Sequence, residues 1–361
     1  MIINELRAGI RYMPLHSPFV TAKGRSEKAR SYVIELSCES GVTGLGAVSP
    51  AQYVTGESME DIERSVPEIG NFIGGREVDD YEAVFGDMRK AFPLAHAARA
   101  GVEMAVMDAW GKAHETPLWR HWGGAKPEVE TDQTISLNSL DVAREEAKRA
   151  ARAGIRQLKI KLDGSYPRDM IHRIRTVHEV APDAVLLLDA NQSFTVNSAK
   201  AFLEILDREQ LPVVLFEQPV DACNVKGLVE VAADSPIPVG ADESVVTPGD
   251  CRTLLDAGGT QVVNIKLMKS GLSGALEIIG MCRSAGVTLM LGCMVESGIG
   301  TGAAVHLACG TGAFTWLDLD APLLLARDIA EGAYTLNGSI YRVSDAPGLG
   351  ARLVPEEYSK T

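Results

Sequence analysis

Eight short apolar runs, each followed by a segment with helical spacing, lie between residues 126 and 320. They are Thr131–Leu137, Gln157–Leu162, Ala184–Asn191, Val213–Gln218, Ile237–Ser244, Gln261–Leu267, Val287–Met294 and Phe314–Asp320. When one residue in each run is taken as a marker, successive markers lie 24 to 28 residues apart. Units of this length are typical of parallel strands joined by helical crossovers, and eight of them can close into a barrel. We therefore predict an α/β fold with a (β/α)8-type barrel. The alternative is a doubly wound open sheet, which the even spacing and the absence of a GxGxxG motif disfavour.

The rest of the chain predicts a second, smaller unit. Arg30–Cys38 is a β-rich run followed by a turn signal, and residues 58–118 have helical spacing, with Ser58 and Asp61 forming a capping pair. A Gly- and Pro-containing linker follows at residues 123–127. We predict an α+β capping domain over residues 1–125, with an antiparallel sheet and then helices. The barrel occupies residues 126–320, and residues 321–361 return to the capping domain.

Charge and composition restrict the partners. The formal net charge is −13, so the chain has no basic surplus for nucleic acid or anionic membranes, and small molecules or cations are favoured. No apolar run reaches the roughly 18 residues that a membrane span needs, and the first residues lack the apolar core of a signal peptide. The six cysteines form no CxxC pair. We expect reduced thiols in a cytoplasmic protein.

Three consecutive predicted strands end in carboxylates. In a barrel the strand ends face a common mouth, which here receives Asp189 with Asn191, then Glu217, then Asp242 with Glu243. Carboxylates that crowd together repel one another unless a cation lies between them. Oxygen ligands without His or Cys suit a hard ion, so we expect Mg²⁺. The competing interpretation is that each acid only caps a helix or lies on the surface.

Lysines end the flanking strands. Lys159 and Lys161 are two residues apart and so point to the same face, and Lys266 lies across the barrel. We expect the charge of Lys159 to lower the pKa of Lys161 and make it a better base. A substrate held between Lys161 and Lys266 could lose a proton to one lysine and receive one from the other. This is the chemistry of proton abstraction next to a carboxylate, with a metal stabilising the developing charge.

Together these residues resemble a known family. The motifs are Lys159-Ile160-Lys161, Asp189-Ala190-Asn191, Glu217-Gln218-Pro219, Gly240-Ala241-Asp242-Glu243-Ser244 and Asn264-Ile265-Lys266. They are similar to those of the enolase superfamily, and more narrowly of its muconate-lactonizing-enzyme subgroup, over nearly the whole chain. The resemblance implies a modified TIM barrel, Mg²⁺ ligation by Asp189, Glu217 and Asp242, and acid/base roles for Lys161 and Lys266. It also implies that Lys159, Asn191 and Glu243 support the site and that the protein forms a symmetric homo-oligomer.

Within this subgroup, the end of the eighth strand points to a reaction. Asp318 and Asp320 face the barrel mouth and would suit a substrate with a positive group, such as the α-ammonium of a dipeptide. This Asp-x-Asp pair resembles the signature of dipeptide epimerases. The segment with Lys23, Arg25 and Ser26 resembles their N-terminal specificity loop. The loop with Cys293, Met294 and Glu296 is expected to line the substrate pocket.

The sequence thus predicts a dipeptide epimerase acting on L-Ala-L-Xaa substrates, with the side chain of Xaa left open. N-acylamino acid racemase, o-succinylbenzoate synthase and muconate-type cycloisomerase are the alternatives on the same scaffold. A Schiff-base aldolase with Lys161 as nucleophile would leave the three acids unexplained. A non-catalytic binding protein is the remaining alternative, although every expected catalytic position is filled.

Overall fold

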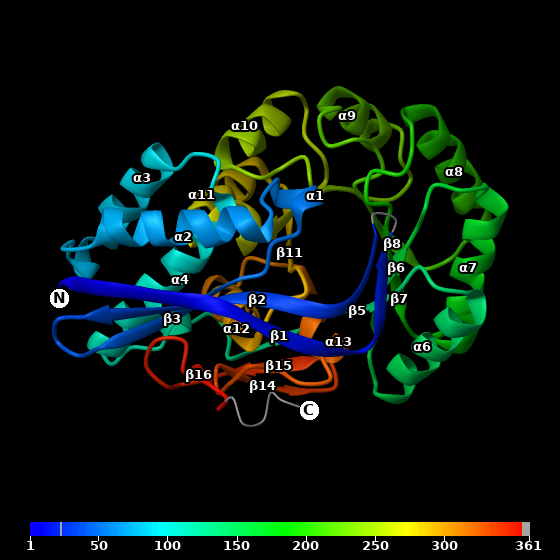
Figure 1. Ribbon diagram of the computed structural model, residues 1–361. Helices are drawn as coiled ribbons and strands as arrows, with labels where there is room; N and C mark the ends of the chain where they lie inside the picture. The colour runs from blue at the N-terminus through cyan, green and yellow to red at the C-terminus, as the bar shows by residue number, and fades with distance from the viewer. Residues whose placement is uncertain (22–23, 356–361) are drawn as a thin grey trace.

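The computed structural model describes residues 1–21 and 24–355, and side chains outside residues 19–26. Eight parallel strands form one sheet in the sequential order β5 to β12 (Figure 1). The strands are β5 (Gln133–Ile135), β6 (Gln157–Lys161), β7 (Val185–Asp189), β8 (Val213–Glu217), β9 (Val239–Ala241), β10 (Val262–Lys266), β11 (Thr288–Gly292) and β12 (Trp316–Asp318). The first and last strands meet through the amide of Asp132, which donates to Leu317 O at 2.8 Å. The predicted barrel is confirmed.

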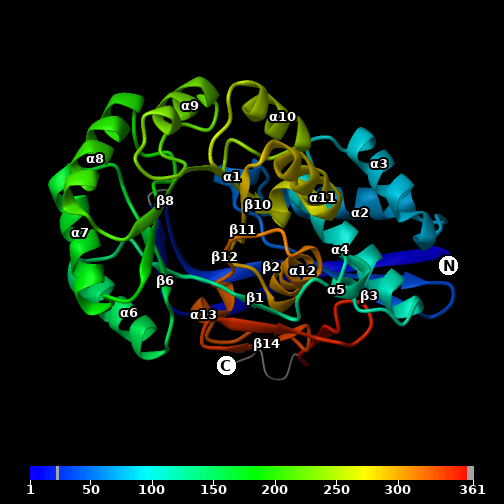
Figure 2. The same cartoon turned by 180° about the vertical axis from the view of Figure 1, so that it is seen from behind.

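A helix follows every strand and packs outside the sheet, as Figure 2 shows from behind. The helices are α6 (Leu140–Arg152), α7 (Pro167–Val180), α8 (Val196–Glu209), α9 (Val225–Ala233), α10 (Pro248–Asp256), α11 (Leu267–Ala285), α12 (Gly298–Thr311) and α13 (Ala321–Leu324). Several begin at side-chain caps; Thr247 and Asp250, for example, form a capping box at α10. The barrel interior has its own small core of Leu187, Leu215, Val262 and Met290. Beyond this apolar layer, the carboxyl ends of the strands carry buried polar side chains such as Asp189, Glu217 and Lys266.

The N-terminal part is an antiparallel sheet covered by helices, as predicted. The strands β1 (Ile3–Thr21), β2 (Gly24–Cys38) and β3 (Thr43–Val48) pair in that order. The helical elements are α1 (Gln52–Thr55), α2 (Met59–Ile73), the 3-10 turn Val78–Asp80, α3 (Tyr81–Ala91), α4 (His96–Ala113) and α5 (Leu118–His121). The predicted capping pair of Ser58 and Asp61 is present at α2. Helix α4 lies directly on β3. The two backbones approach so closely at Gly44 that a Cβ there would stand 2.0 Å from Ala105 O.

Helix α4 also joins this part to the barrel. Helix α11 is broken at Gly271, which has a φ of 70°, a conformation that favours glycine. The fully buried carboxylate of Glu103, from α4, accepts hydrogen bonds from the amide and hydroxyl of Ser273 just after the break. A Cβ at Gly271 would lie 2.6 Å from Glu103 Oε2. A buried charged side chain from one part of the chain therefore caps a helix of the other.

The C-terminal segment forms small sheets beside both parts. Strand β14 (Tyr334–Asn337) pairs with β15 (Ile340–Val343), and β15 pairs with β4 (Glu128–Glu130). Strand β13 (Ala330–Glu331) pairs with β16 (Arg352–Leu353). Contacts with the N-terminal part include the bridges Leu15–Leu325 and Pro117–Gly348. The domain boundaries themselves stay a prediction. None of the helices described is long and apolar enough to cross a membrane.

Candidate active site

The predicted charged residues meet at the carboxyl ends of β6 to β10. Register places Lys161, Asp189 and Glu217 side by side on β6, β7 and β8, and Asp242 follows the end of β9. Lys266 is the last residue of β10. All five side chains are buried or nearly so. The even strand lengths thus bring residues that are far apart in the sequence into one layer.

Within this layer, cations and anions alternate. Lys161 Nζ lies 2.5 Å from Asp189 Oδ2, and Lys266 Nζ lies 2.6 Å from Asp242 Oδ2. Lys159 Nζ is enclosed by three carboxylates, at 3.1 Å from Asp189, 2.8 Å from Glu217 and 2.6 Å from Asp318. Each lysine is held as an ammonium by at least one buried carboxylate.

These pairs shift the pKa values in opposite directions. Burial alone would raise the pKa of Asp189, but the ammonium groups of Lys159 and Lys161 outweigh it and lower the pKa. Burial raises the pKa of Glu217 to about 7, although Lys159 opposes the rise. Burial lowers the pKa of Lys161, yet Asp189 outweighs it and the net shift is upward. The charge of Lys159 lowers the pKa of Lys161 as expected, but the carboxylates outweigh this effect, so the net shift does not make Lys161 a better base in this structure.

Two residues to which the sequence reasoning gave no role hold the carboxylates in place. Lys269 Nζ donates to Asp242 Oδ1 at 2.7 Å and to Asn264 O at 2.9 Å, and its side chain is fully buried. Asn264 Nδ2 donates to Glu217 Oε1 at 2.7 Å. Lys269 lies three residues after Lys266, on the helix that follows the strand, so strand spacing gave no signal for it.

The donor set fits a hard cation. Among the described groups, Glu217 Oε2, Glu243 Oε2 and Asn191 Oδ1 are buried oxygens without a hydrogen-bond partner. Lys159 lies close to Glu217 Oε2 as an ion pair, but it is not aligned to donate a hydrogen bond. Buried oxygens without donors are costly unless a cation or water satisfies them. Two neighbouring carboxylates and one amide with spare oxygens, beside Asp189 and Asp242 and without a nitrogen or sulfur ligand, are suited to Mg²⁺.

The backbone at this edge is held in an unusual conformation. Asn191 has a φ of 40° and Gln218 a φ of 37°, in the left-handed region that favours glycine. The amide of Asn191 donates to Asp189 Oδ1 at 2.9 Å, and Gln218 Oε1 accepts the amide of Asp242 at 2.8 Å. Hydrogen bonds to the site itself therefore accompany the strained residues, a pattern typical of functional sites.

A second acidic group lies on the opposite side of the mouth, between β5 and β12. Oxygen atoms of Asp132, Asp318 and Asp320 all lie within 4.8 Å of one another. Thr134 donates its amide to Asp320 Oδ2 at 2.7 Å, and Lys159 pairs with Asp318. Asp132 is fully buried, and neither of its oxygens accepts a hydrogen bond from any described group. Burial and the neighbouring Asp318 raise the pKa of Asp132 well above its usual range.

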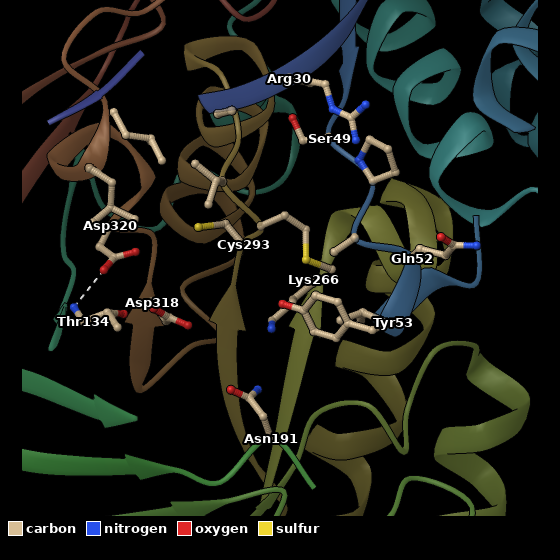
Figure 3. A pocket seen from close by; sticks show the side chains of 18 of the residues that line it. Arg30, Ser49, Gln52, Tyr53, Thr134, Asn191, Lys266, Cys293, Asp318 and Asp320 are labelled. Atoms are coloured by element: carbon tan, nitrogen blue, oxygen red, sulfur yellow. Dashed lines mark hydrogen bonds between the residues drawn. The ribbon is translucent and has the colours of Figure 1, made fainter. Parts of the chain in front are cut away.

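One cavity connects the two charged groups and extends to the N-terminal sheet. Its volume is about 330 Å³. From the barrel it is lined by Thr134, Lys161, Asn191, Lys266, Cys293, Met294, Asp318 and Asp320 (Figure 3). From the N-terminal part it is lined by Leu15, residues 28–30 of β2, and residues 49–54, which include α1. Both lysines expected to act on a substrate thus face the same space.

Not every expected residue lines this cavity. Glu296 is buried away from it, and its Oε1 accepts the amide of Met294 at 3.0 Å, so it shapes the loop. Lys159 is likewise enclosed by carboxylates and does not line the cavity. Glu243 stands behind Asn191, whose Nδ2 lies 3.3 Å from its Oε1. Lys23 lies outside the described residues, and of Arg25 and Ser26 only the backbone is described.

The comparison with known protein families decides the relationship. Residues 142–357 match the description "Enolase C-terminal domain-like", and residues 6–123 match "Mandelate racemase / muconate lactonizing enzyme, N-terminal domain". The chain belongs to this family of the enolase superfamily. It is an enzyme of the isomerase class. The resemblance in the strand-end motifs is confirmed over nearly the full length.

Individual relatives agree on the class of substrate and differ in its side chain. The chain is 33% identical to an aromatic dipeptide epimerase of Herpetosiphon aurantiacus, with 97% of this chain and 99% of the relative covered. It is 35% identical to an L-Ala-D/L-Glu epimerase of Clostridium acetobutylicum, with 97% and 98% covered. The solved dipeptide epimerase of Enterococcus faecalis, complexed with Mg and L-Leu-L-Tyr, superimposes with a TM-score of 0.93 at 32% identity, covering 97% and 99%.

Proposed function

We propose that this protein is a Mg²⁺-dependent dipeptide epimerase that inverts the α-carbon of the C-terminal residue of its substrate. The observation that carries the proposal is that Lys161 and Lys266 line one cavity from two non-adjacent strands, together with Asp318 and Asp320. Two opposed lysines permit removal of a proton from one face and delivery to the other. The names of the relatives support the dipeptide as substrate class.

In this mechanism the substrate carboxylate lies toward the ends of β7 to β9. Asp189, Glu217 and Asp242 would hold Mg²⁺, which when bound supplies positive charge next to that carboxylate. The carboxylate gains charge when the α-proton leaves and the enediolate forms, and Lys159 provides a further buried positive charge nearby. Asn191 and Glu243 keep the acidic layer ordered.

The proton moves between the two lysines. One of them, in its neutral form, removes the α-proton, and the other, as an ammonium, donates a proton to the opposite face of the planar carbon. In this structure Asp189 and Asp242 hold both lysines as ammonium ions. A carboxylate engaged with a metal ion attracts its neighbouring ammonium less strongly, which lowers the pKa of the lysine toward that of a usable base.

The other end of the substrate lies toward β12. Asp318 and Asp320 would bind the α-ammonium of the N-terminal residue, because they form an excess of negative charge in the cavity wall. Cys293 and Met294 line the adjacent wall. The roles of Lys23, Arg25 and Ser26 in side-chain recognition, a cytoplasmic location and a symmetric homo-oligomer remain predictions.

The proposal is tested by exchange of the α-proton. The protein is incubated with Mg²⁺ and a library of L-Ala-L-Xaa dipeptides in D₂O, and deuterium uptake is read by mass spectrometry. We expect a gain of one mass unit in a subset of dipeptides, together with epimerised product. N-acylamino acids are tested alongside as substrates of the alternative activity, an N-acylamino acid racemase. Uptake in those substrates and in no dipeptide would overturn the proposal.

A further inference from the structure

Two cations of the N-terminal sheet face the candidate active site. Lys28 and Arg30 lie two residues apart on β2, both are exposed, and both line the cavity. Their strand partners on β1 are Pro14 and Tyr12, neither of which carries charge. Figure 3 shows Arg30 beside Ser49, at a different end of the cavity from Asp318 and Asp320.

Among the described side chains, no partner matches the charge of these two residues. Neither Lys28 nor Arg30 forms an ion pair with any side chain that the structure describes, whereas Arg7 on β1 pairs with Glu5 at 2.9 Å. The carboxylate of Glu60 on α2 feels the charge of Arg30, but only weakly beside its hydrogen bonds at the helix start. The cavity is thus positive near β2 and negative near β12.

The proposed reaction fixes where a substrate side chain can go. When the α-carbon becomes planar, its three remaining substituents are the carboxylate, the amide nitrogen and the side chain, roughly 120° apart. The two lysines occupy the faces above and below this plane. The carboxylate takes the direction of β7 to β9, and the amide nitrogen leads to the ammonium near Asp318. The side chain is left with the third direction, toward the wall that β2 and residues 49–54 form.

We propose that Lys28 and Arg30 select dipeptides whose epimerised residue carries an anionic side chain. This inference rests on the proposed function and extends it to the substrate side chain. A guanidinium and a carboxylate form strong, directional hydrogen bonds, and the guanidinium of Arg30, which lines the cavity, donates to none of the described groups. The apolar neighbours Leu15 and Tyr53 would pack against the methylene groups of such a side chain.

The decisive comparison uses two substrates of nearly the same shape. We expect kcat/KM for L-Ala-L-Glu to exceed that for L-Ala-L-Gln by at least about tenfold, which corresponds to about 1.4 kcal/mol. In Arg30→Gln this ratio should fall about tenfold or more, and the double variant Lys28→Gln/Arg30→Gln should lower it further. Arg30→Lys should keep part of the preference, because the charge remains while the fork of donors is lost.

The matched control is Arg168→Gln, an exposed arginine of α7 that does not line the cavity, and it should leave the ratio unchanged. A wild-type enzyme that prefers neutral or aromatic side chains, or an Arg30→Gln variant with an unaltered ratio, would overturn the inference while the epimerase assignment stands. An enzyme that exchanges the α-proton of no dipeptide would overturn the proposed function instead.

Discussion

The two sides of the barrel mouth differ in how their charges are matched. On the side of β6 to β10, four carboxylates (Asp189, Glu217, Asp242 and Glu243) face four lysines (Lys159, Lys161, Lys266 and Lys269). On the side of β5 and β12 there are three carboxylates, and among the described side chains only Lys159, which also serves the other side, forms an ion pair with one of them. One side is balanced and the other is left negative.

This difference suits the side of β6 to β10 to proton transfer and the side of β5 and β12 to binding a cationic group. In a buried ion pair, the carboxylate keeps the lysine protonated. A metal or substrate that engages this carboxylate therefore lowers the pKa of the paired lysine. The unbalanced side gains stability from any cation that enters. The contrast supports proton transfer at one side and ammonium binding at the other.

The largest expected effect tests the balanced side. Lys161→Ala should lower kcat for dipeptide epimerisation by about 10⁴-fold, because general acid–base catalysis by one positioned group contributes up to this factor. Chiral analysis of the products and deuterium exchange measure the loss. Lys148→Ala, on the outer helix α6, is the control and should be fully active. Normal epimerisation by Lys161→Ala would contradict the two-lysine mechanism.

Removal of the metal should have the next largest effect. Treatment with a chelator should reduce activity by about 10³-fold, since a bound metal supplies several kcal/mol of charge stabilisation. Addition of Mg²⁺ should restore it. Direct Mg²⁺ binding by calorimetry should be lost in Glu217→Gln, and unchanged affinity in that variant would place the ion elsewhere.

The unbalanced side should show its effect in substrate binding. Asp318→Asn/Asp320→Asn should raise KM for dipeptides about 100-fold and change kcat less, because the ammonium lies away from the reacting carbon. Initial rates over a range of dipeptide concentrations separate the two parameters. A variant with an unchanged KM would show that these aspartates do not bind the ammonium.

The smallest effect concerns stability. The pKa of Asp132 is raised in the folded protein, so folding retains its proton and stability falls as pH rises above about 4. Asp132→Asn removes this cost and should add about 1–2 kcal/mol to the free energy of unfolding at pH 8, and less at pH 5. Urea unfolding at both pH values measures the gain. The exposed Asp256→Asn should show no such difference, and a destabilised Asp132→Asn would contradict the argument.

The residues at the strand ends could be predicted from the sequence, whereas residues placed by tertiary packing could not. Strand periodicity located Lys161, Asp189, Glu217, Lys266 and Asp318, because residues at equivalent strand ends must meet at one mouth. It could not locate Lys269, whose place depends on how α11 turns back over the strand. It also gave no signal for Arg30, because tertiary packing decides which residues of the N-terminal sheet lie at the barrel mouth.

Loop positions were harder still. Glu296 was expected in the cavity from its place after a strand, but the close approach of Gly300 leaves its carboxylate buried beneath the loop. A period of two says which face a strand residue takes. It says nothing of a side chain in the turn that follows.

The clamp between Glu103 and the broken helix α11 has a consequence for motion during turnover. Sliding or hinging of α4 away from the barrel would separate the buried carboxylate of Glu103 from the amide and hydroxyl of Ser273 and leave it without these two hydrogen-bond donors. We therefore expect helix α4 and the barrel to move together as one rigid body. Substrates would then enter past the residues of the N-terminal part that line the cavity, residues 28–30 and 49–54, so that side-chain specificity can change there while the charged residues of the barrel stay the same.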